Sequence, residues 1–365
     1  MPLKSKPEIH AVIMAGGRGE RFWPYSREGK PKQFLALAGL KPLIAETVDR
    51  LKGWIPNSRI WVVTNAKHTA LVRRLCPQLK KSQVVGEPVG KDTAPCIAVA
   101  AALIAKKNPN AVMVVLPADH RIGPRNKFTQ VLQEAADLAA ERSVLVTLGI
   151  PPRSPHTGYG YIHAHDAVPV NGRNPFYRVN AFKEKPNLAT AKKYLRKKEF
   201  YWNSGIFIWR ADTILEDIQA YLPKTAALAY KIAAAWGTRR QNAVLARAYG
   251  AFEKISIDYG VLEKAQNVIM AKAPFQWDDL GSWSSLSKYL SRSTDSNSIQ
   301  GNHVGAETRG CTLVSHKGLI ATLGVSDLVI VATPDVTLVA AKDKEQELKK
   351  LLGQIRGQSK LHPFL

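Results

Sequence analysis

Residues 10–32 read HAVIMAGGRGERFWPYSREGKPK and carry the strongest local indication of the fold. This stretch opens with a short apolar run, Ala11–Met14, which we predict to be a buried strand, and this run leads directly into a glycine-rich segment. Glycines there let the backbone approach a ligand closely, and successive N–H groups can cradle phosphates. We therefore expect a phosphate-binding loop immediately after the strand. Its glycines are Gly16, Gly17 and Gly19.

This loop differs from the two commonest phosphate-binding motifs. A Walker A loop needs Gly-Lys-Ser/Thr, which residues 10–32 lack. The dinucleotide fingerprint GxGxxG fails as well, because Phe22 stands at its last glycine. Arg21 and Lys32 instead give the loop a cationic rim, for which a turn without a ligand would have no use.

Short β-branched runs alternate with longer amphipathic runs over the first two thirds of the chain. This alternation is typical of an α/β fold whose ligands bind at the carboxyl ends of the strands. We expect a Rossmann-like, mixed but mostly parallel sheet with helices on both faces. The predicted strands are Ala11–Met14, Ile60–Thr64, Ala111–Leu116, Val144–Leu148, Tyr159–His163, Arg178–Phe182 and Ile206–Trp209. The predicted helices are Ile44–Leu51, His68–Leu75, Ala94–Lys106, Lys127–Arg142, Leu188–Lys197 and Thr213–Tyr221.

The composition changes at residues 291–302, a polar run without apolar periodicity that we interpret as a domain boundary. We expect a large domain over residues 1–292 and a small one over residues 297–365. Short strand-like pieces separated by glycines predict a β-helix-like unit in the small domain. An apolar stripe at i, i+3, i+4 and i+7 then predicts a closing helix. The stripe consists of Leu348, Leu351, Leu352 and Ile355.

The chain is strongly basic, with 52 Lys and Arg against 29 Asp and Glu among 365 residues and a net charge of +23. Such a charge attracts polyanions. The basic residues are nevertheless spread along the chain, mostly in pairs, and no common nucleic-acid-binding signature is present. We interpret them mainly as solvated faces, with a phosphorylated small substrate as a further reason, and expect no nucleic-acid partner.

Cysteine and hydropathy patterns bound the cellular location. The three cysteines, Cys76, Cys96 and Cys311, have neither disulfide-framework nor zinc-site spacing, which favours a reducing cytoplasm. The longest apolar run, Ala94–Ala105, falls short of the roughly 20 residues that cross a bilayer. We expect no signal peptide, since the short apolar stretch near the N-terminus runs into the glycine loop.

Acidic residues follow two distant apolar segments. Asp119 ends an apolar strand, and Asp278 and Asp279 lie between Trp277 and Trp283. An Asp after a strand is often only a helix cap. Two carboxylates could, however, share one Mg²⁺, which prefers carboxylates, substrate phosphates and water as ligands. Either Asp278 or Asp279 could be the second ligand.

Three further segments suit the walls of a pocket. Residues 157–161 (TGYGY) offer backbone N–H groups and an aromatic face, residues 182–186 (FKEKP) a carboxylate beside an ammonium, and residues 202–205 (WNSG) an amide. Taken singly, they are also compatible with a hairpin turn, an exposed ion pair and a capped strand start. Their occurrence together favours the pocket.

Nine motifs, in order along nearly the whole chain, resemble those of the sugar-phosphate nucleotidyltransferases, and among them the mannose-1-phosphate guanylyltransferases. They include VIMAGGRGERFWPYSR, GEPVGKDTAPCIA, LPADH, FKEKP, WNSGIFIW, SIDYGVLEK and WDDLGSW. The resemblance implies a Rossmann-like nucleotide-binding domain with a left-handed β-helix-like tail. It also implies transfer of GMP from GTP to mannose 1-phosphate, with Mg²⁺ as cofactor.

The resemblance further implies a role for individual residues. The nucleotide would be bound by Ala15, Gly16, Gly17, Gly19, Glu87, Asp92 and Thr93, and the phosphates clamped by the catalytic Arg21 and Lys32. The sugar phosphate would be bound by Gly160, Glu184, Lys185 and Asn203, and the metal by Asp119 and Asp279. Asp92 stands where relatives usually have Asn, so an acceptor-only carboxylate replaces an amide that also donates.

Charge dictates the expected chemistry. A sugar 1-phosphate carries about −1.5 to −2 charges at pH 7, so its attacking oxygen is already ionised and needs no general base. Catalysis should therefore consist of positioning and neutralisation.

Alternatives are a transferase for another nucleotide and sugar phosphate, a binding protein that has lost catalysis, and a nucleic-acid-binding protein. The resemblance also implies a homodimer, and we expect no isomerase domain, because the chain stops directly after the closing helix.

Overall fold

The computed structural model describes the whole chain except residues 1–6, 18, 38 and 184. The chain divides into two compact units. The first comprises residues 1–16, 48–118 and 122–277, and the second comprises residues 17–47, 119–121 and 278–365. Three elements include residues of both units, namely α1 (Leu43–Arg50), β5 (Arg121–Gly123) and β11 (Gln276–Asp278).

The first unit is built on a nine-stranded mixed sheet with the order β3-β2-β1-β4-β9-β6-β10-β8-β7. The pairings give β8 and β9 one direction and the other strands of this sheet the opposite one, which confirms the predicted mostly parallel sheet. The strands are β1 (Ile9–Ala15), β2 (Ile60–Asn65), β3 (Val84–Glu87), β4 (Val112–Pro117), β6 (Leu145–Ile150), β7 (Tyr161–Val168), β8 (Phe176–Lys183), β9 (Phe200–Arg210) and β10 (Val268–Lys272).

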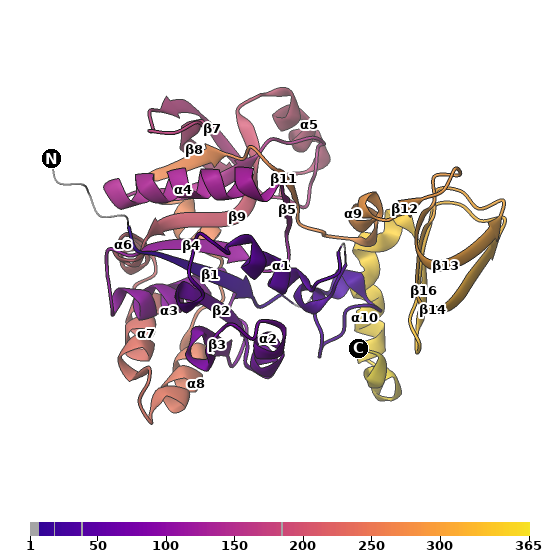
Figure 1. Ribbon diagram of the computed structural model, residues 1–365, viewed down its shortest axis with the longest axis horizontal. Coiled ribbons are helices and arrows are strands. Elements are labelled where there is room, and N and C mark those ends of the chain that lie inside the picture. Colours follow the sequence, from indigo (N-terminus) through magenta and orange to yellow (C-terminus); the bar gives the residue numbers. More distant parts are fainter. Residues whose placement is uncertain (1–6, 18, 38, 184) are drawn as a thin grey trace. The chain divides into compact units, whose positions relative to one another are not determined.

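Helices cover both faces of this sheet, as predicted (Figure 1). The almost wholly apolar α3 is buried in a cluster with Val12, Met113 and Val115, whereas α4 packs on β4, β6 and β9. Ile13 and Val114, which alternate with the first set, are also buried. The helices are α2 (Thr69–Leu75), α3 (Thr93–Ala105), α4 (Arg125–Glu141), α5 (Leu188–Arg196), α6 (Ala211–Tyr221), α7 (Pro223–Ala235) and α8 (Gln241–Ala251).

The second unit contains a five-stranded sheet with the order β12-β13-β14-β15-β16. Its three middle strands are parallel, and the two outer pairings are antiparallel. The strands are β12 (Ser291–Arg292), β13 (Ser298–Ala306), β14 (Thr312–Leu323), β15 (Leu328–Ala332) and β16 (Thr337–Ala341), and the helices are α9 (Trp283–Leu286) and α10 (Leu348–Arg356). The predicted closing helix is thus present as α10.

An apolar cluster joins distant parts of the second unit. Leu348, Leu352 and Ile355 of α10 are buried with side chains from β14, β15 and β16 and with Phe22 and Trp23. The spacing of these three residues explains why α10 turns one face inward. Segment 17–47 and the C-terminal region therefore share one core although they lie at opposite ends of the sequence.

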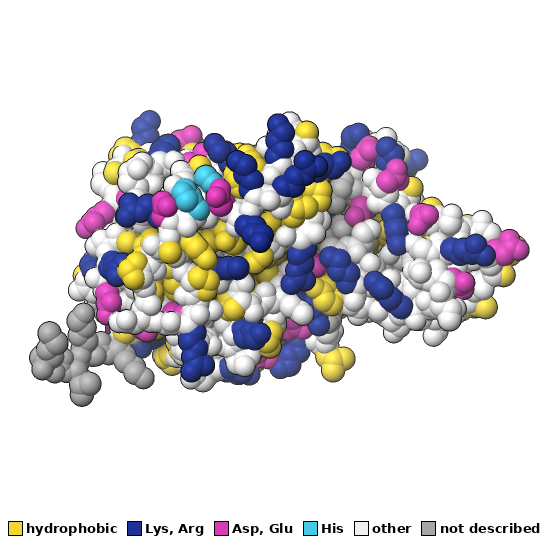
Figure 2. Space-filling model, turned by 90° about the horizontal axis from the view of Figure 1, so that it is seen from above, with side chains coloured by type: hydrophobic (Ala, Val, Ile, Leu, Met, Phe, Trp, Pro, Cys, Tyr) yellow, Lys and Arg dark blue, Asp and Glu magenta, His cyan; other side chains and the backbone are white. Residues whose placement is uncertain are grey.

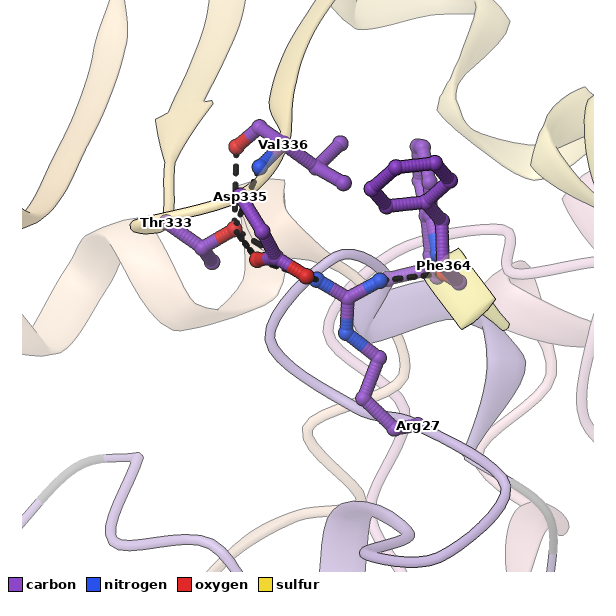
Figure 3. A network of polar contacts seen from close by, with 6 residues as sticks. Arg27, Thr333, Asp335, Val336 and Phe364 are labelled. Atoms are coloured by element: carbon purple, nitrogen blue, oxygen red, sulfur yellow. Dashed lines mark hydrogen bonds and ion pairs between the residues drawn. The ribbon is translucent and has the colours of Figure 1, made fainter. Parts of the chain in front are cut away.

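Polar contacts reinforce this connection (Figure 3). Arg27 Nη2 pairs with the carboxylate of Asp335 at 2.9 Å, and Arg27 Nη1 donates to the backbone oxygen of Phe364. Trp23 Nε1 donates to the same oxygen of Phe364 at 2.7 Å. The chain just after the glycine loop is thereby fixed to the C-terminal segment.

Short helical segments complete the fold. They are η1 (Glu20–Phe22), η2 (Lys32–Phe34), η3 (Asn57–Arg59), η4 (Ala66–His68), η5 (Lys81–Gln83), η6 (Asp258–Leu262), η7 (Ser287–Tyr289), η8 (Lys342–Glu347) and η9 (Ser359–Phe364). Within the described ranges, no helix has both the length and the apolar character needed to cross a membrane. Figure 2 shows Lys and Arg side chains scattered over the visible face, with apolar side chains between them.

Candidate active site

The glycine loop begins where β1 ends at Ala15. Thr64 Oγ1 of β2 donates to the Ala15 oxygen at 2.9 Å, and the side chains of Ser26 and Gln33 donate to the oxygens of Gly19 (2.7 Å) and Gly17 (2.9 Å). Residues that follow the loop thus hold two of its carbonyl groups. Arg18, inside the loop, lies outside the described residues.

Gly19 occupies a position of the loop that does not tolerate a side chain. Its φ of +63° is in the left-handed region, and a Cβ there would collide with the backbone and Cβ of Lys32. The close approach places the first residue of η2 against the loop. A Cβ on Gly17, by contrast, would meet nothing within 4 Å.

Lys32 connects the two predicted metal-ligating aspartates. Its side chain is only 7% exposed, and Nζ donates to Asp119 Oδ2 at 2.7 Å and to the backbone oxygen of Asp279. Asp119 and Asp279, which are distant in the sequence, therefore contact one ammonium group. The sequence predicted all three residues for the site, but not this contact.

Asp119 is held in its ionised form. Burial alone would raise the pKa of its carboxyl, but the charges of Lys32 and His120 and the hydrogen bond from Lys32 outweigh burial and lower the pKa below its usual value. The carboxylate is therefore available as an anionic ligand at neutral pH.

The geometry separates Asp278 from Asp279. Asp278 is buried, its Oδ1 accepts from the Leu280 N–H at 2.8 Å, and its Oδ2 lies 3.3 Å from the Tyr289 hydroxyl. The Asp278 carboxylate thus stabilises the turn before α9. Asp279 instead lines a cavity together with Asp119.

This cavity has a volume of about 400 Å³ and lies wholly within the second unit. It collects the catalytic candidates Arg21 and Lys32, the metal candidates Asp119 and Asp279, and the loop residue Gly19. The remaining lining residues are Glu20, Phe22, His120, Leu280, Gly281 and Lys349. Among the described side chains, no group of three or more His, Cys, Asp or Glu residues is arranged to hold a metal.

Glu87 is the principal buried acid of the first unit's candidate site. It ends β3, is 5% exposed, and its Oε1 has no hydrogen-bond partner among the described residues. A Cβ on Gly16 would lie 3.2 Å from Glu87 Oε2, so the glycine loop begins directly beside this carboxylate. Burial, aided by the charge of Asp92, raises the pKa of Glu87 to about 7, although the nearby Tyr249 hydroxyl opposes this rise.

Asp92 and Thr93 start α3. The Asp92 carboxylate accepts from the Thr93 N–H at 2.8 Å, which caps the helix, and the Thr93 hydroxyl oxygen accepts from the Ile257 N–H at 2.8 Å. Asp92 has φ +70°, a strained conformation for a residue with a side chain. Both side chains therefore have structural partners in addition to their predicted roles toward the nucleotide.

The sugar-phosphate candidates are partly brought together. The Asn203 N–H donates to the Gly160 oxygen at 2.8 Å, and Asn203 Nδ2 donates to Asp258 Oδ1 at 2.7 Å. Lys185 is exposed just after β8, and Glu184 lies outside the described residues. Sequence reasoning did not single out Asp258, although it belongs to the SIDYGVLEK motif and opens η6, a π-helical turn of a kind that is frequent at functional sites.

Comparison with known proteins identifies two family matches. Residues 10–296 match the nucleotidyl transferase family, and residues 301–355 match the MannoseP isomerase/GMP-like beta-helix domain. The chain is 37% identical over 352 residues to a mannose-1-phosphate guanylyltransferase of Salmonella montevideo, covering 95% of this chain and 74% of that protein. It is 35% identical to the Escherichia coli K12 mannose-1-phosphate guanylyltransferase over 98% of this chain and 75% of that protein.

A solved structure resembles the chain over nearly its whole length. The crystal structure described as a mannose-1-phosphate geranyltransferase from Thermus thermophilus superimposes with a TM-score of 0.84. The two sequences are 35% identical, and the match covers 96% of this chain and 99% of that one.

Proposed function

The chain belongs to the mannose-1-phosphate guanylyltransferases of the nucleotidyl transferase family, and from this premise we propose how its own residues carry out the reaction. The reaction transfers GMP from GTP to α-D-mannose 1-phosphate and gives GDP-mannose and pyrophosphate. A phosphate oxygen of the sugar phosphate attacks the α-phosphorus of GTP. A new P–O bond forms there, and the bond between the α-phosphorus and the departing pyrophosphate breaks.

One observation carries this assignment of roles. Lys32 contacts both Asp119 and Asp279 inside a cavity that Arg21 also lines. Arg21 has no hydrogen-bond or ion-pair partner among the described residues, so its guanidinium remains available to a phosphate. Guanidinium and ammonium groups bind phosphates by charge-assisted hydrogen bonds.

The catalytic problem is repulsion between two anions, because the sugar phosphate is ionised before it attacks. Arg21 and Lys32 would neutralise the triphosphate and keep its phosphates in line with the attacking oxygen. The pair between Lys32 and Asp119, with its 2.7 Å separation, fixes the ammonium before substrate binds. Positioning of this kind lowers the barrier without a general base.

Asp119 and Asp279 would hold the divalent cation, which we propose to be Mg²⁺. Both residues line one cavity, and carboxylate oxygens are the protein ligands that Mg²⁺ prefers. The lowered pKa of Asp119 suits a metal ligand, since only the ionised form binds. When bound, the cation supplies further positive charge to the phosphates.

Glu87 would recognise guanine. The ring presents two neighbouring donors, N1–H and the exocyclic amino group, and a carboxylate offers two acceptor oxygens. A buried carboxylate oxygen without a partner loses hydration energy that a bound donor restores. Ala15, Gly16 and Gly17 would contact the nucleotide through their backbone, and Asp92 and Thr93 would approach its ribose.

The sugar phosphate would be held by groups near β7, β8 and β9. Asn203, oriented by its hydrogen bonds to Asp258 and Gly160, would bind sugar hydroxyls together with Glu184. Lys185 would bind the phosphate, because it is an exposed ammonium group at the end of β8.

We expect a catalytic domain over residues 1–292, a β-helix-like domain over residues 297–365, and a homodimer in the cytoplasm. Exposed apolar side chains of the C-terminal strands provide a candidate dimer contact, and the three cysteines are buried thiols, in keeping with a reducing compartment. The exposed side chains are Val304, Leu319, Leu323 and Val339.

Pyrophosphate release tests the function. GTP, ATP, dTTP and UTP are each supplied with mannose 1-phosphate or glucose 1-phosphate, with Mg²⁺ present, and initial rates are compared. We expect the highest kcat/KM for GTP with mannose 1-phosphate. A clear preference for a nucleotide without guanine would overturn the role of Glu87 and the substrate assignment.

A further inference from the structure

Lys349 reaches the phosphate-binding cavity from the far end of the sequence. It lies in the first turn of α10 and lines the cavity with Gly19, Arg21 and Lys32 of the glycine-loop segment. All of these residues belong to the second unit, whose core includes the buried face of α10. The C-terminal helix therefore contributes a cation to a site otherwise made of glycine-loop and aspartate segments.

Several contacts fix the position of this helix. Its buried residues Leu348 and Leu352 flank Lys349 and belong to the same core as Phe22 of η1. At the other end of α10, Arg356 Nη2 lies 2.7 Å from Glu20 Oε1, which joins the helix to the residue before Arg21. The position of Lys349 beside the cavity is thus a consequence of packing.

The ion pairs described for the cavity involve neither Lys349 nor Arg21. Glu20 is paired with Arg356, and Asp119 is paired with Lys32 at 2.7 Å. Lys349, like Arg21, has no hydrogen-bond or ion-pair partner in the part of the chain that the structure describes. Asp279 is the third lining carboxylate, and the two cations beside the glycine loop suit an anion with several charges.

We infer that Lys349 is a further substrate-binding residue and that its ammonium group binds the β- and γ-phosphates of GTP, which leave as pyrophosphate. This inference rests on the proposed function. The polyphosphate is the favoured ligand because the cavity contains the phosphate candidates Arg21 and Lys32, whereas Lys185, the candidate for the sugar phosphate, is not among its lining residues.

The neighbouring Lys350 provides a matched control. It lies on the same helix, is also exposed, and its Nζ pairs with Glu347 Oε2 at 2.7 Å instead of lining the cavity. Lys349→Gln and Lys350→Gln remove the same charge from adjacent positions. Because both side chains are exposed, both variants should fold, and their melting temperatures should agree with that of the wild type.

The kinetic test measures KM for GTP and mannose 1-phosphate in the forward direction and for pyrophosphate in reverse. Lys349→Gln is expected to raise KM for GTP and pyrophosphate about 5-fold or more, with little change for mannose 1-phosphate, and Lys349→Arg should restore most of the loss. The inference is overturned if Lys349→Gln and Lys350→Gln behave alike, or if KM for mannose 1-phosphate rises equally.

A binding measurement separates failure of this inference from failure of the proposed function. Isothermal titration with Mg²⁺-pyrophosphate needs no turnover and no nucleotide specificity. Lys349→Gln should weaken this binding about 5-fold or more relative to Lys350→Gln. Equal affinities would contradict the role of Lys349 even in a fully active enzyme, while wild-type turnover with GTP independently tests the function.

Discussion

Replacing Glu87 by Gln should weaken GTP binding and, at the same time, stabilise the fold. Glu87 is 5% exposed, and its Oε1 has no hydrogen-bond partner among the described residues. Burial, aided by the charge of Asp92, raises its pKa from 4.5 to about 7. The folded chain therefore holds a carboxylate whose ionised form the unliganded protein poorly accommodates.

The sign of the stability effect follows from linkage. A raised folded-state pKa means that the folded chain binds the Glu87 proton more tightly than the unfolded chain does. The stability that this tighter proton binding gives the folded chain is fully present below pH 4.5 and is lost as the pH rises to about 7. Relative to an unshifted carboxyl, the raised pKa of Glu87 then lowers the free energy of unfolding by about 1 kcal/mol near pH 5 and about 3 kcal/mol near pH 8, because each pKa unit corresponds to about 1.4 kcal/mol. Glu87→Gln removes this pH-dependent cost.

The effect on activity has the opposite sign. In Gln, an amide NH₂ donor replaces one acceptor oxygen of the carboxylate, and it would face the N1–H and amino donors of guanine. Loss of a hydrogen bond to a charged group costs about 1.5–3 kcal/mol, so kcat/KM for GTP should fall about 10- to 100-fold. In the wild type, kcat/KM for GTP should also rise with pH through about 7 as Glu87 ionises. Glu87→Gln should lack this rise of kcat/KM with pH. The variant therefore serves as a control for pH effects that come from titration of the substrates.

Urea unfolding near pH 5 and pH 8, with steady-state kinetics at the same pH values, measures both effects. From pH 5 to pH 8, the free energy of unfolding of Glu87→Gln should rise relative to that of the wild type by about 2 kcal/mol or more. An unchanged stability difference together with unchanged kcat/KM for GTP would refute both the buried charge and its role in guanine recognition.

Two further pairs of substitutions test the loop and the cap. Gly19→Ala forces a side chain into a left-handed conformation against Lys32, so urea unfolding should show a loss on the order of 2 kcal/mol or more, whereas Gly17→Ala should change stability little. Equal losses would show that Gly19 is not the constrained position. Asp92→Ala removes the cap of α3 and should cost about 1 kcal/mol, while Asp92→Asn should keep the cap and remain within about 0.5 kcal/mol of the wild type. A comparable loss in both Asp92 variants would mean that the charge, and not the cap, stabilises the helix.

The α/β architecture was predictable because its elements are locally encoded. The apolar β-branched runs that predicted β1, β2 and β4 are buried on both faces, as parallel strands between helices must be. Helices α7 and α8 were missed, since their Ala-rich segments, residues 223–235 and 241–251, lack a pronounced apolar stripe. Strand β13 was missed because most of its side chains are exposed, so the polar run shows no alternation.

The sequence indicated which residues were candidates for the site, but not which of them contact one another. The positions of Gly16, Lys32 and Asp119 after predicted strands, or beside the loop, suggested phosphate and metal chemistry. The ion pair between Lys32 and Asp119, by contrast, depends on a fold that brings together residues far apart in the sequence. The hydrogen bond between Asn203 and Asp258 and the arrival of Lys349 at the cavity are likewise products of tertiary packing, for which local sequence carries no signal.

We propose that Asp119 and Asp279 bind one divalent cation at the cavity that Arg21 and Lys32 also line. Electron paramagnetic resonance titration of Mn²⁺ in the presence of GTP measures this binding directly, with Asp278→Asn as the control. Asp119→Asn and Asp279→Asn should each weaken Mn²⁺ binding by about 10-fold or more, because each removes an anionic ligand, whereas Asp278→Asn should bind nearly as the wild type does. Wild-type affinity in both of the first two variants, or a loss confined to Asp278→Asn, would contradict the claim.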